Sequence, residues 1–274
     1  MKRKVLILTV SRKVSLIKAF KDAGWHVTGQ DLNPKAVALN FCDAIAQSDK
    51  EEGPFDLILP TRDADLKIGT HRSSDKTIDI CTDKLQFSKS CETFGIKTPF
   101  VFHTEKTSIR GEHGVSFVKP RFSSSENKSG GLVECVYQEI LKGEEYSVDG
   151  FSDFQGNVIS LVPRKRLKII SGESCVTSTA ENQELLLQSQ RLAQSLRLIG
   201  HYVMQCFKVG QEYIWTDVNL RYGGASAVAI KAGCKSPEWY LRLINGEEVR
   251  PCIGEYQRGL VGYSYSEWLF GVQE

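Results

Sequence analysis

The sequence predicts an α/β protein that changes to α+β architecture in its second part. Over the first 80 residues or so, apolar runs of strand length alternate with helical patterns, which is typical of parallel βαβ units. From Val115 onward, strands and hairpins dominate and carry most of the polar side chains. A length of 274 residues allows one large domain or two ordinary domains, with room for a sizeable core.

Each predicted element follows from a local pattern. The strands expected in the first part are residues 5–10, 25–30, 55–60 and 77–81, and the first is a continuous apolar run suited to a buried parallel strand. Helices are expected at 11–23, 83–93, 181–197 and 236–244. We expect Ser11 to cap the first helix, Ser178 or Thr179 the third, and Ser236 the fourth, with Pro237 at its first helical position.

Composition narrows the functional classes. The chain is 41% hydrophobic and 25% charged with a net charge of +2, which gives no electrostatic reason to expect nucleic-acid or membrane binding. No apolar run approaches the roughly 20 residues that span a bilayer, so a cytoplasmic protein is expected. The eight cysteines show no C-x-x-C spacing and are expected to be reduced thiols. The turn at residues 9–13 has no glycine, which argues against dinucleotide binding there.

A polar hairpin stands out in the second part. Residues 202–207 and 213–221 are strand-like runs, and Gly210 is expected to lie in the turn between them. Side chains on a strand alternate between its two faces, so three polar residues of the second run share one face: Asp217, Asn219 and Arg221.

The register of this hairpin decides whether Gln205 joins them. With the turn centred on Gln211, Gln205 lies directly opposite Asp217. One carboxylate and two amide oxygens then suit Mg²⁺, and Arg221 suits a phosphate. The alternative is a solvated face with an Asp–Arg ion pair, and a turn shifted by one residue would place Gln205 on the other face. The pattern alone leaves both open.

Residues 217–224, DVNLRYGG, resemble the E-x-N-P-R-F-G-G signature of ATP-grasp enzymes. The closest resemblance is to the carbamoyl-phosphate-synthase-like, carboxylate–amine ligase branch. It implies a Rossmann-like pre-ATP-grasp domain at 1–82 and an ATP-grasp domain at 83–274, with a short lid subdomain at about 114–142. It also implies ATP and Mg²⁺ as cofactors, with Gln205, Asp217 and Asn219 as metal ligands.

Further motifs occur in the family's order: TDK at 82–84, FVKPRF at 117–122, YQEILKGEEYSVD at 137–149, VPRKR at 162–166 and SGE at 171–173. The resemblance implies that Lys119, Arg164 and Arg221 carry the catalytic charges. It assigns nucleotide binding to Lys84, Lys119, Ser123, Ser124, Gln138, Glu139, Leu141 and Glu145. In this assignment Gln138 and the backbone of Glu139 and Leu141 meet adenine, whereas Glu145 meets the ribose hydroxyls.

Other interpretations of these residues stay open from the sequence alone. Lys119 is either a buried ammonium that needs a phosphate or a lysine that extends to solvent from a strand end. Glu145 is either the ribose ligand or an ordinary exposed acid. Arg164 and Arg166 share a face, which suits either an anionic substrate or solvent. For His201 we expect a structural role.

The sequence also departs from the family pattern. Asp217 stands where the family has Glu, Leu220 stands where it has Pro, and the phosphate loop at 121–131 is rich in serine, with glycines only at its end.

The implied activity is a Mg·ATP-dependent ligase that activates a carboxylate as an acyl phosphate and joins it to an amine. Its partners would be a small carboxylate and a small amine, with neither nucleic acid nor membrane, and a homodimer is possible by family precedent. Two alternatives are an ATP-binding regulatory homologue with reduced catalysis and a metabolite-binding module without turnover.

Overall fold

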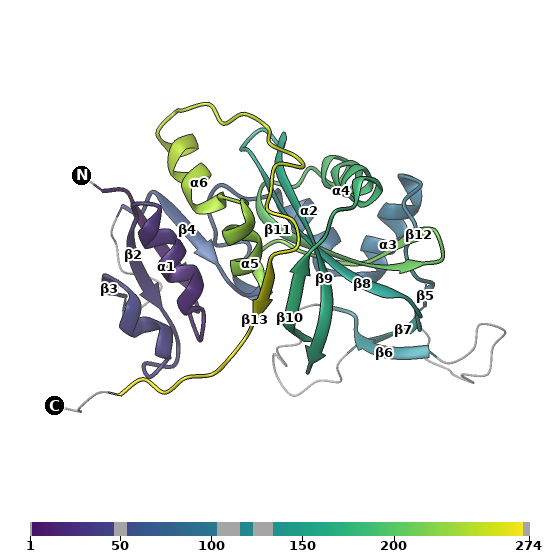
Figure 1. The fold of residues 1–274 in the computed structure, drawn as a ribbon, viewed down its shortest axis with the longest axis horizontal. Coiled ribbons are helices and arrows are strands. Elements are labelled where there is room, and N and C mark those ends of the chain that lie inside the picture. Colours follow the sequence, from purple (N-terminus) through teal and green to yellow (C-terminus); the bar gives the residue numbers. More distant parts are fainter. Residues whose placement is uncertain (1, 47–53, 103–115, 123–133, 271–274) are drawn as a thin grey trace.

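The computed structural model describes residues 2–46, 54–102, 116–122 and 134–270 (Figure 1). Its first part is a parallel sheet of order β3-β2-β1-β4. The strands are β1 (Lys4–Leu8), β2 (His26–Gln30), β3 (Ala44–Ile45) and β4 (Leu57–Pro60). Helix α1 (Val14–Asp22) and two 3₁₀ helices, η1 (Val37–Phe41) and η2 (Asp63–Asp65), lie between or after them. The α/β prediction for this part is confirmed.

The start of α1 differs from the prediction. The helix begins at Val14 and its N-cap is Lys13, which makes no capping bond through its side chain. Ser11 instead lies in the left-handed region, with φ of 47°, and its backbone N–H donates to the carboxylate of Asp31 at 2.7 Å. Ser11 is therefore not the cap, because its backbone is held in the turn by the end of β2.

The predicted strand at 77–81 is wrong, because these residues belong to helix α2 (Asp75–Thr82). The oxygen of Ser74 accepts the N–H of Thr77 at 3.2 Å and caps the helix. Ile78 and Cys81, three residues apart, are buried on one side, which is helical and not strand spacing. Helix α2 packs against β12 and α3 (Lys84–Thr93), so it accompanies the second part of the fold. The domain boundary at 82 stays a prediction.

The second part is built on a six-stranded sheet of order β12-β11-β8-β9-β10-β13. Its strands are β8 (Glu144–Ser152), β9 (Val158–Ile170), β10 (Glu173–Thr179), β11 (Gly200–Val209), β12 (Glu212–Asn219) and β13 (Val261–Tyr263). All neighbouring strands in it are antiparallel. Three further helices belong to this part, α4 (Gln183–Leu196), α5 (Ser226–Ala232) and α6 (Ser236–Ile244).

Helix α4 is capped by a residue that the sequence prediction did not choose. Asn182 accepts the backbone N–H of Leu185 at 3.0 Å, whereas the expected caps Ser178 and Thr179 lie at the end of strand β10. Helix α6 has the predicted bounds with Pro237 in its first turn, although its N-cap is Lys235 rather than Ser236.

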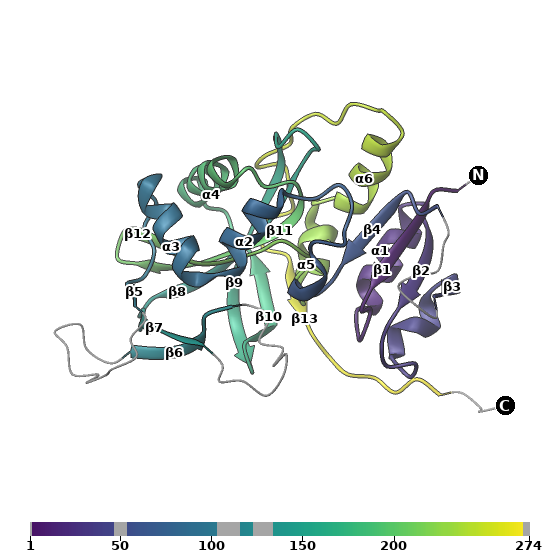
Figure 2. The same ribbon diagram turned by 180° about the vertical axis from the view of Figure 1, so that it is seen from behind.

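Two large hydrophobic cores hold the molecule together. One lies between the six-stranded sheet and helices α2, α3 and α4, which Figure 2 shows together on one side. The other joins α1 and the parallel sheet to α5, α6 and the end of β8. Within it the rings of Phe20 and Tyr222 are 6.0 Å apart, and the indole N–H of Trp25 donates to the carbonyl of Pro237 at 2.9 Å. This second core therefore contains side chains from both parts of the chain.

A small sheet of order β5-β7-β6 lies below the six-stranded sheet in Figure 1. Its strands are β5 (Val101–Phe102), β6 (Ser116–Pro120) and β7 (Cys135–Glu139), all antiparallel neighbours. An isolated β-bridge between Asp83 and Phe122 connects the end of β6 to the start of α3. Among the described helices, none is long and apolar enough to cross a membrane.

Candidate active site

A cleft of about 450 Å³ lies where β6, the six-stranded sheet and the loop after β4 meet. It gathers seven of the residues predicted from the sequence: Lys84, Lys119, Arg164, Gln205, Asp217, Asn219 and Arg221. Four predicted nucleotide ligands are not among the residues that line it: Gln138, Glu139, Leu141 and Glu145. Ser123 and Ser124 lie outside the described residues. Lys84 and Arg221, which are 137 positions apart in sequence (221 − 84), thus share one cavity.

The metal face of the hairpin has the predicted register at the point that matters. Gln205 pairs with Asp217, and both side chains are half-buried at the cleft. The predicted turn centre is wrong, because Val209 pairs with Glu212 in a two-residue turn. A β-bulge at Thr216 adds one residue to β12 and restores the opposition of Gln205 and Asp217.

The oxygen donors of this face fit a magnesium ion. The set combines the Asp217 carboxylate with the amide oxygens of Gln205 and Asn219. A single carboxylate is the usual protein contribution for Mg²⁺, which takes its other ligands from phosphates and water. The chemistry and placement of this chain's own residues therefore suit a nucleotide-bound Mg²⁺.

Two lysines face the carboxylate from the other side of the cleft. The Nζ of Lys119 on β6 is 3.7 Å from Oδ2 of Asp217. Lys84, the first residue of α3, lines the same cavity. Burial lowers the pKa of Lys84, and Lys119 adds to this, while Asp217 acts in the opposite direction. Two ammonium groups that line one partly buried cleft favour a polyanion between them.

Arg221 is held by a carboxylate that the sequence prediction missed. Its Nε donates to Oδ1 of Asp63 at 2.8 Å and its Nη2 to Oδ2 at 3.2 Å, a bidentate pair. Asp63 follows the carboxyl end of β4, where ligands bind in open parallel sheets, so a signal for it was present in the sequence. The first part of the chain thereby positions a cationic group of the second.

Arg164 lies deeper, at the floor of the cleft. Only 2% of its side chain is exposed, and its Nε donates to Oδ2 of Asp149 at 2.7 Å. Its Nη1 donates to the hydroxyl of Thr177 at 3.3 Å. Burial alone would raise the pKa of Asp149, but Arg164 and His201 bring it down to about 2. The pair is therefore charged, and the solvated-strand interpretation of Arg164 is wrong.

Glu145 is neither an exposed acid nor a free one. Its carboxylate pairs with Nη1 of Arg166, whose Nη2 donates to the carbonyl of Gly172 at 2.5 Å. Glu145 is largely buried, with 19% of its side chain exposed. Through Arg166, Glu145, the predicted ribose ligand, is connected to the tip of the β9–β10 hairpin. This tip lines the cleft at Gly172 and Glu173.

The predicted adenine segment lies at the end of β7. Gln138 is buried, and Leu141 is half-buried after the strand ends. The backbone N–H of Glu139 donates to the carbonyl of Phe100 at 3.0 Å and so already takes part in a backbone hydrogen bond. The roles of these three residues in adenine binding stay predictions.

The sequence prediction also missed a group of charges at the interface between the two parts. Lys13, in the turn after β1, is electrostatically coupled to Arg221 and to Glu173 at the start of β10. Burial lowers the pKa of Lys13, with Arg221 next in importance. Glu173 itself lines the cleft, so that end of the cavity carries charges of both signs.

Comparison with known proteins agrees with this geometry. Residues 132–261 match the family described as "ATP-grasp in the biosynthetic pathway with Ter operon". No curated protein is significantly similar in sequence.

Solved structures are similar over almost the whole chain. N5-carboxyaminoimidazole synthetase from Staphylococcus aureus has a TM-score of 0.72 at 14% identity, over 94% of this chain and 81% of that one. Phosphoribosylglycinamide synthetase from Anaerococcus prevotii has a TM-score of 0.66 at 14% identity, over 90% and 76%. The biotin carboxylase domain of 2-oxoglutarate carboxylase from Hydrogenobacter thermophilus, in complex with MgADP, ADP and bicarbonate, has a TM-score of 0.72 at 14% identity, over 94% and 73%. The chain thus has the fold of these synthetases and of the carboxylase domain, and residues 132–261 within it match an ATP-grasp family.

Proposed function

We propose that this protein is a Mg·ATP-dependent carboxylate–amine ligase. A carboxylate oxygen of the first substrate attacks the γ-phosphorus of ATP, so that ADP leaves and an acyl phosphate forms. The nitrogen of an amine then attacks the carbonyl carbon and inorganic phosphate leaves. The products are ADP, phosphate and an amide. Similarity of fold to two synthetases and to a carboxylase domain crystallised with MgADP supports this proposal.

The observation that carries the proposal is that oxygen ligands for a cation and positively charged side chains for phosphates line the same cleft. Oxygen donors on the β11–β12 hairpin face Lys84 and Lys119, and Arg164 and Arg221 lie along the same cavity. Phosphoryl transfer needs little covalent chemistry from the protein and depends on positioning and on charge stabilisation. This arrangement provides both without a nucleophilic side chain.

Each group has a distinct part in the proposed reaction. Lys119 and Lys84 hold the phosphates, and Gln205, Asp217 and Asn219 would hold a Mg²⁺ ion, which neutralises phosphate charge when bound. Arg221 would bind the transferred phosphoryl oxygens through its planar fork while Asp63 fixes its orientation. Arg164 would fix the anionic end of the acyl phosphate from the floor of the cleft.

The direct test is ADP release by the purified full chain with Mg·ATP and a panel of carboxylates and amines. We expect release to depend on one acid and one amine together, with the amide detected by mass spectrometry. Tight Mg·ATP binding without release across the panel would indicate a regulatory homologue. Absence of nucleotide binding would leave a metabolite-binding module and contradict the proposal.

Two substitutions test the site assignment. Asp217→Asn removes the only carboxylate of the metal face, and Lys119→Ala removes an ammonium from the phosphates. We expect each to abolish ADP release, with a circular dichroism spectrum like that of the wild type. Matched controls are Asp79→Asn and Lys97→Ala, at exposed ion pairs with Lys67 and Glu212, which should keep full activity. Wild-type activity in both site variants would overturn the assignment.

The finer features of the proposal concern partners and location. We propose a small-molecule acid and amine as substrates, and a homodimer as the assembly to look for by light scattering. A cytoplasmic location is proposed because all eight cysteines are free thiols, which suits a reducing compartment.

A further inference from the structure

A network of buried polar side chains lies beneath the floor of the cleft and ends at Arg164. Asp149 on β8 has no exposed surface and binds the guanidinium of Arg164 through Oδ2. On the other oxygen of the same carboxylate, Nε2 of His201 lies 3.3 Å from Oδ1. His201 is 3% exposed, and neither it nor Asp149 lines the cleft. Asp149 reaches the cleft through Arg164, which lines it.

The imidazole of His201 is fixed in its plane and at its second nitrogen. Its ring stacks on Tyr222 at 3.8 Å with an angle of 9° between the planes. Its Nδ1 is 3.1 Å from the hydroxyl oxygen of Ser236, which accepts the hydroxyl of Tyr222 at 2.9 Å. The backbone N–H of His201 donates to the hydroxyl of Tyr240 at 3.0 Å.

These contacts select one tautomer. A carboxylate oxygen 3.3 Å from Nε2 of His201 favours a proton on that nitrogen, and the hydroxyl of Ser236, which accepts from Tyr222, can then donate to Nδ1. The proton of the neutral imidazole then lies on Nε2, which is 3.3 Å from Oδ1 of Asp149 and 3.4 Å from the hydroxyl oxygen of Ser226. Burial lowers the pKa of His201 and Asp149 only partly offsets this, which agrees with the neutral form.

We propose that His201, as its neutral Nε2–H tautomer, is a positioning residue that fixes Arg164 through Asp149. The carboxylate would otherwise rotate about its last bond, because Arg164 contacts mainly one of its two oxygens. Oδ1 is buried and has no partner that meets hydrogen-bond geometry among the described residues, so Nε2–H of His201, 3.3 Å away, is the donor that would fix the carboxylate plane and hence the guanidinium. The catalytic consequence rests on the proposed ligase function, whereas the position of Arg164 does not.

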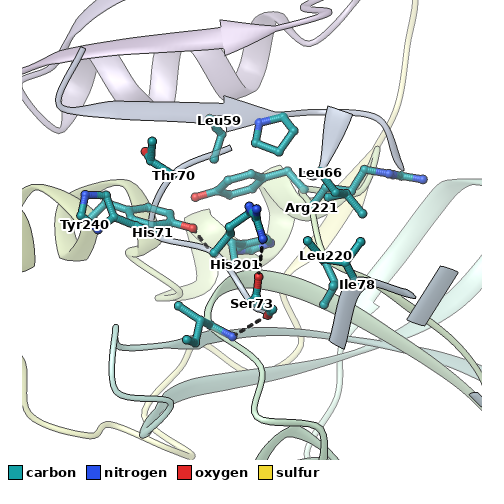
Figure 3. A pocket seen from close by; sticks show the side chains of 14 residues that line it. Leu59, Leu66, Thr70, His71, Ser73, Ile78, His201, Leu220, Arg221 and Tyr240 are labelled. Carbon is teal, nitrogen blue, oxygen red and sulfur yellow. Dashed lines mark hydrogen bonds between the residues drawn. The ribbon is translucent and has the colours of Figure 1, made fainter. Parts of the chain in front are cut away.

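The network also reaches the contact between the two parts of the chain. His201, Tyr222 and Tyr240 line a small cavity of about 20 Å³ together with Leu59 and Leu66 of the first part. Figure 3 shows His201, Tyr240, Leu59 and Leu66 among the side chains around it. Tyr222 additionally packs on Phe20 of α1. Support for the floor of the cleft therefore comes from the core that joins the two parts.

The tautomer is tested by long-range ¹H–¹⁵N spectroscopy on protein labelled at its five histidines. Loss of one set of signals in His201→Gln assigns His201. We expect a protonated Nε2 and an unprotonated Nδ1 in the folded protein at pH 7. An Nδ1–H tautomer or an imidazolium at this pH would overturn the proposal.

The positioning role is tested with three variants. His201→Phe keeps the stacking ring but removes both nitrogens, whereas the amide of His201→Gln can still donate to Asp149. We expect the Nε–H resonance of Arg164 to shift or broaden in the Phe variant and to be restored in the Gln variant. His71→Asn is the matched control, because His71 also lines the small cavity and stacks on Phe154. Its backbone φ is 50°, and Asn tolerates this left-handed conformation. An Arg164 resonance that is the same in wild type and His201→Phe would overturn the proposal.

Kinetics give a second and independent readout. In His201→Phe we expect the KM for the carboxylic acid substrate to rise by about tenfold, which is the scale of one charge-assisted hydrogen bond. The Kd for Mg·ADP should stay within about twofold, because His201 does not line the cleft. Equal weakening of acid and nucleotide would indicate a merely structural role. Absence of acid-dependent ADP release in the wild type would instead count against the ligase function and leave the spectroscopic test intact.

Discussion

At the scale of single residues, the cleft shows arginines whose direction is set by carboxylates to which the sequence analysis gave no role. Arg221 belongs to the DVNLRYGG motif, but Asp63 that holds it lies 158 residues earlier. Arg164 is similarly held by Asp149. A guanidinium at the end of four rotatable bonds is useful for binding only when such a partner restricts it.

Asp63→Asn tests this control of Arg221. The substitution keeps the shape of the side chain but removes one charge-assisted acceptor from a largely buried pair. We expect a loss of about 1–3 kcal/mol in unfolding free energy and a clear fall in ADP release. Guanidinium chloride unfolding and the release assay measure the two effects. Asp79→Asn, at an exposed pair, should change neither, and an equal result for both variants would refute the role of Asp63.

At the scale of elements, the β11–β12 hairpin has a short turn and a β-bulge whose effects on the strand register cancel. A two-residue turn alone would move Asp217 out of register with Gln205 and onto the other face. The bulge at Thr216, whose hydroxyl donates to the carbonyl of Gln205 at 3.3 Å, adds the residue that restores the pairing. A bulge of this kind carries no reliable sequence signal, so the expected pairing was right although the expected turn was wrong.

Helix α4 offers a prediction at the same scale. Asn182→Ala removes the acceptor for the N–H of Leu185 at the first turn. It also removes the amide that donates to the hydroxyl of Tyr213. We expect a loss of about 1–2 kcal/mol in unfolding free energy, measured by denaturant titration. Ser178→Ala, at the position that the sequence favoured, should cost less than about 0.5 kcal/mol, and the reverse order would contradict this cap.

At the scale of the whole molecule, the shared core predicts cooperative unfolding. Phe20 is fully buried on α1 and contacts both Trp25 and Tyr222. We expect Phe20→Ala to cost about 3–5 kcal/mol, with one transition seen alike by tryptophan fluorescence and circular dichroism. Phe270→Ala, in an exposed position, should change stability by less than about 0.5 kcal/mol. Two separate transitions would show that the two parts unfold independently.

The pH dependence of stability is a second prediction for the whole molecule. Burial lowers the pKa of both His201 and His71, so the unfolded chain binds more protons than the folded chain below the ordinary value near 6.5. Their contribution to stability is therefore complete above about pH 7.5 and is lost as the pH falls. For the buried His201 we expect a decrease of at most about 1.4 kcal/mol per pH unit below pH 6.5, and for the exposed His71 a smaller one.

Denaturant titrations between pH 8 and 5 measure this slope. In His201→Gln the slope should become shallower by the share of one histidine, whatever the change in stability at pH 8. The control is Asn182→Ala, which lowers stability without removing a histidine and should keep the wild-type slope. A wild-type slope in His201→Gln would contradict the assignment of His201 as a buried neutral base.

The sequence by itself determined the features that depend on neighbouring residues or on motif spacing. Apolar runs marked β1, β2 and β4, and alternation placed Asp217 and Asn219 on one strand face. The order of motifs identified the ATP-grasp fold. Patterns of this kind reach only over neighbouring residues, and this limited the prediction. The segment 77–81 was misassigned, because so short a run with apolar residues at 78, 80 and 81 fits a strand or a helix until its packing partner is known.

Only the tertiary structure decided how the charges of the cleft are held. The partners Asp63, Asp149 and His201 are distant in sequence from the arginines that they position. A hydrogen bond between side chains has no sequence period, and its energy depends on burial that exists only after the core has formed. For that reason the groups that bind could be predicted from the chain, whereas the groups that orient them became visible only in the fold.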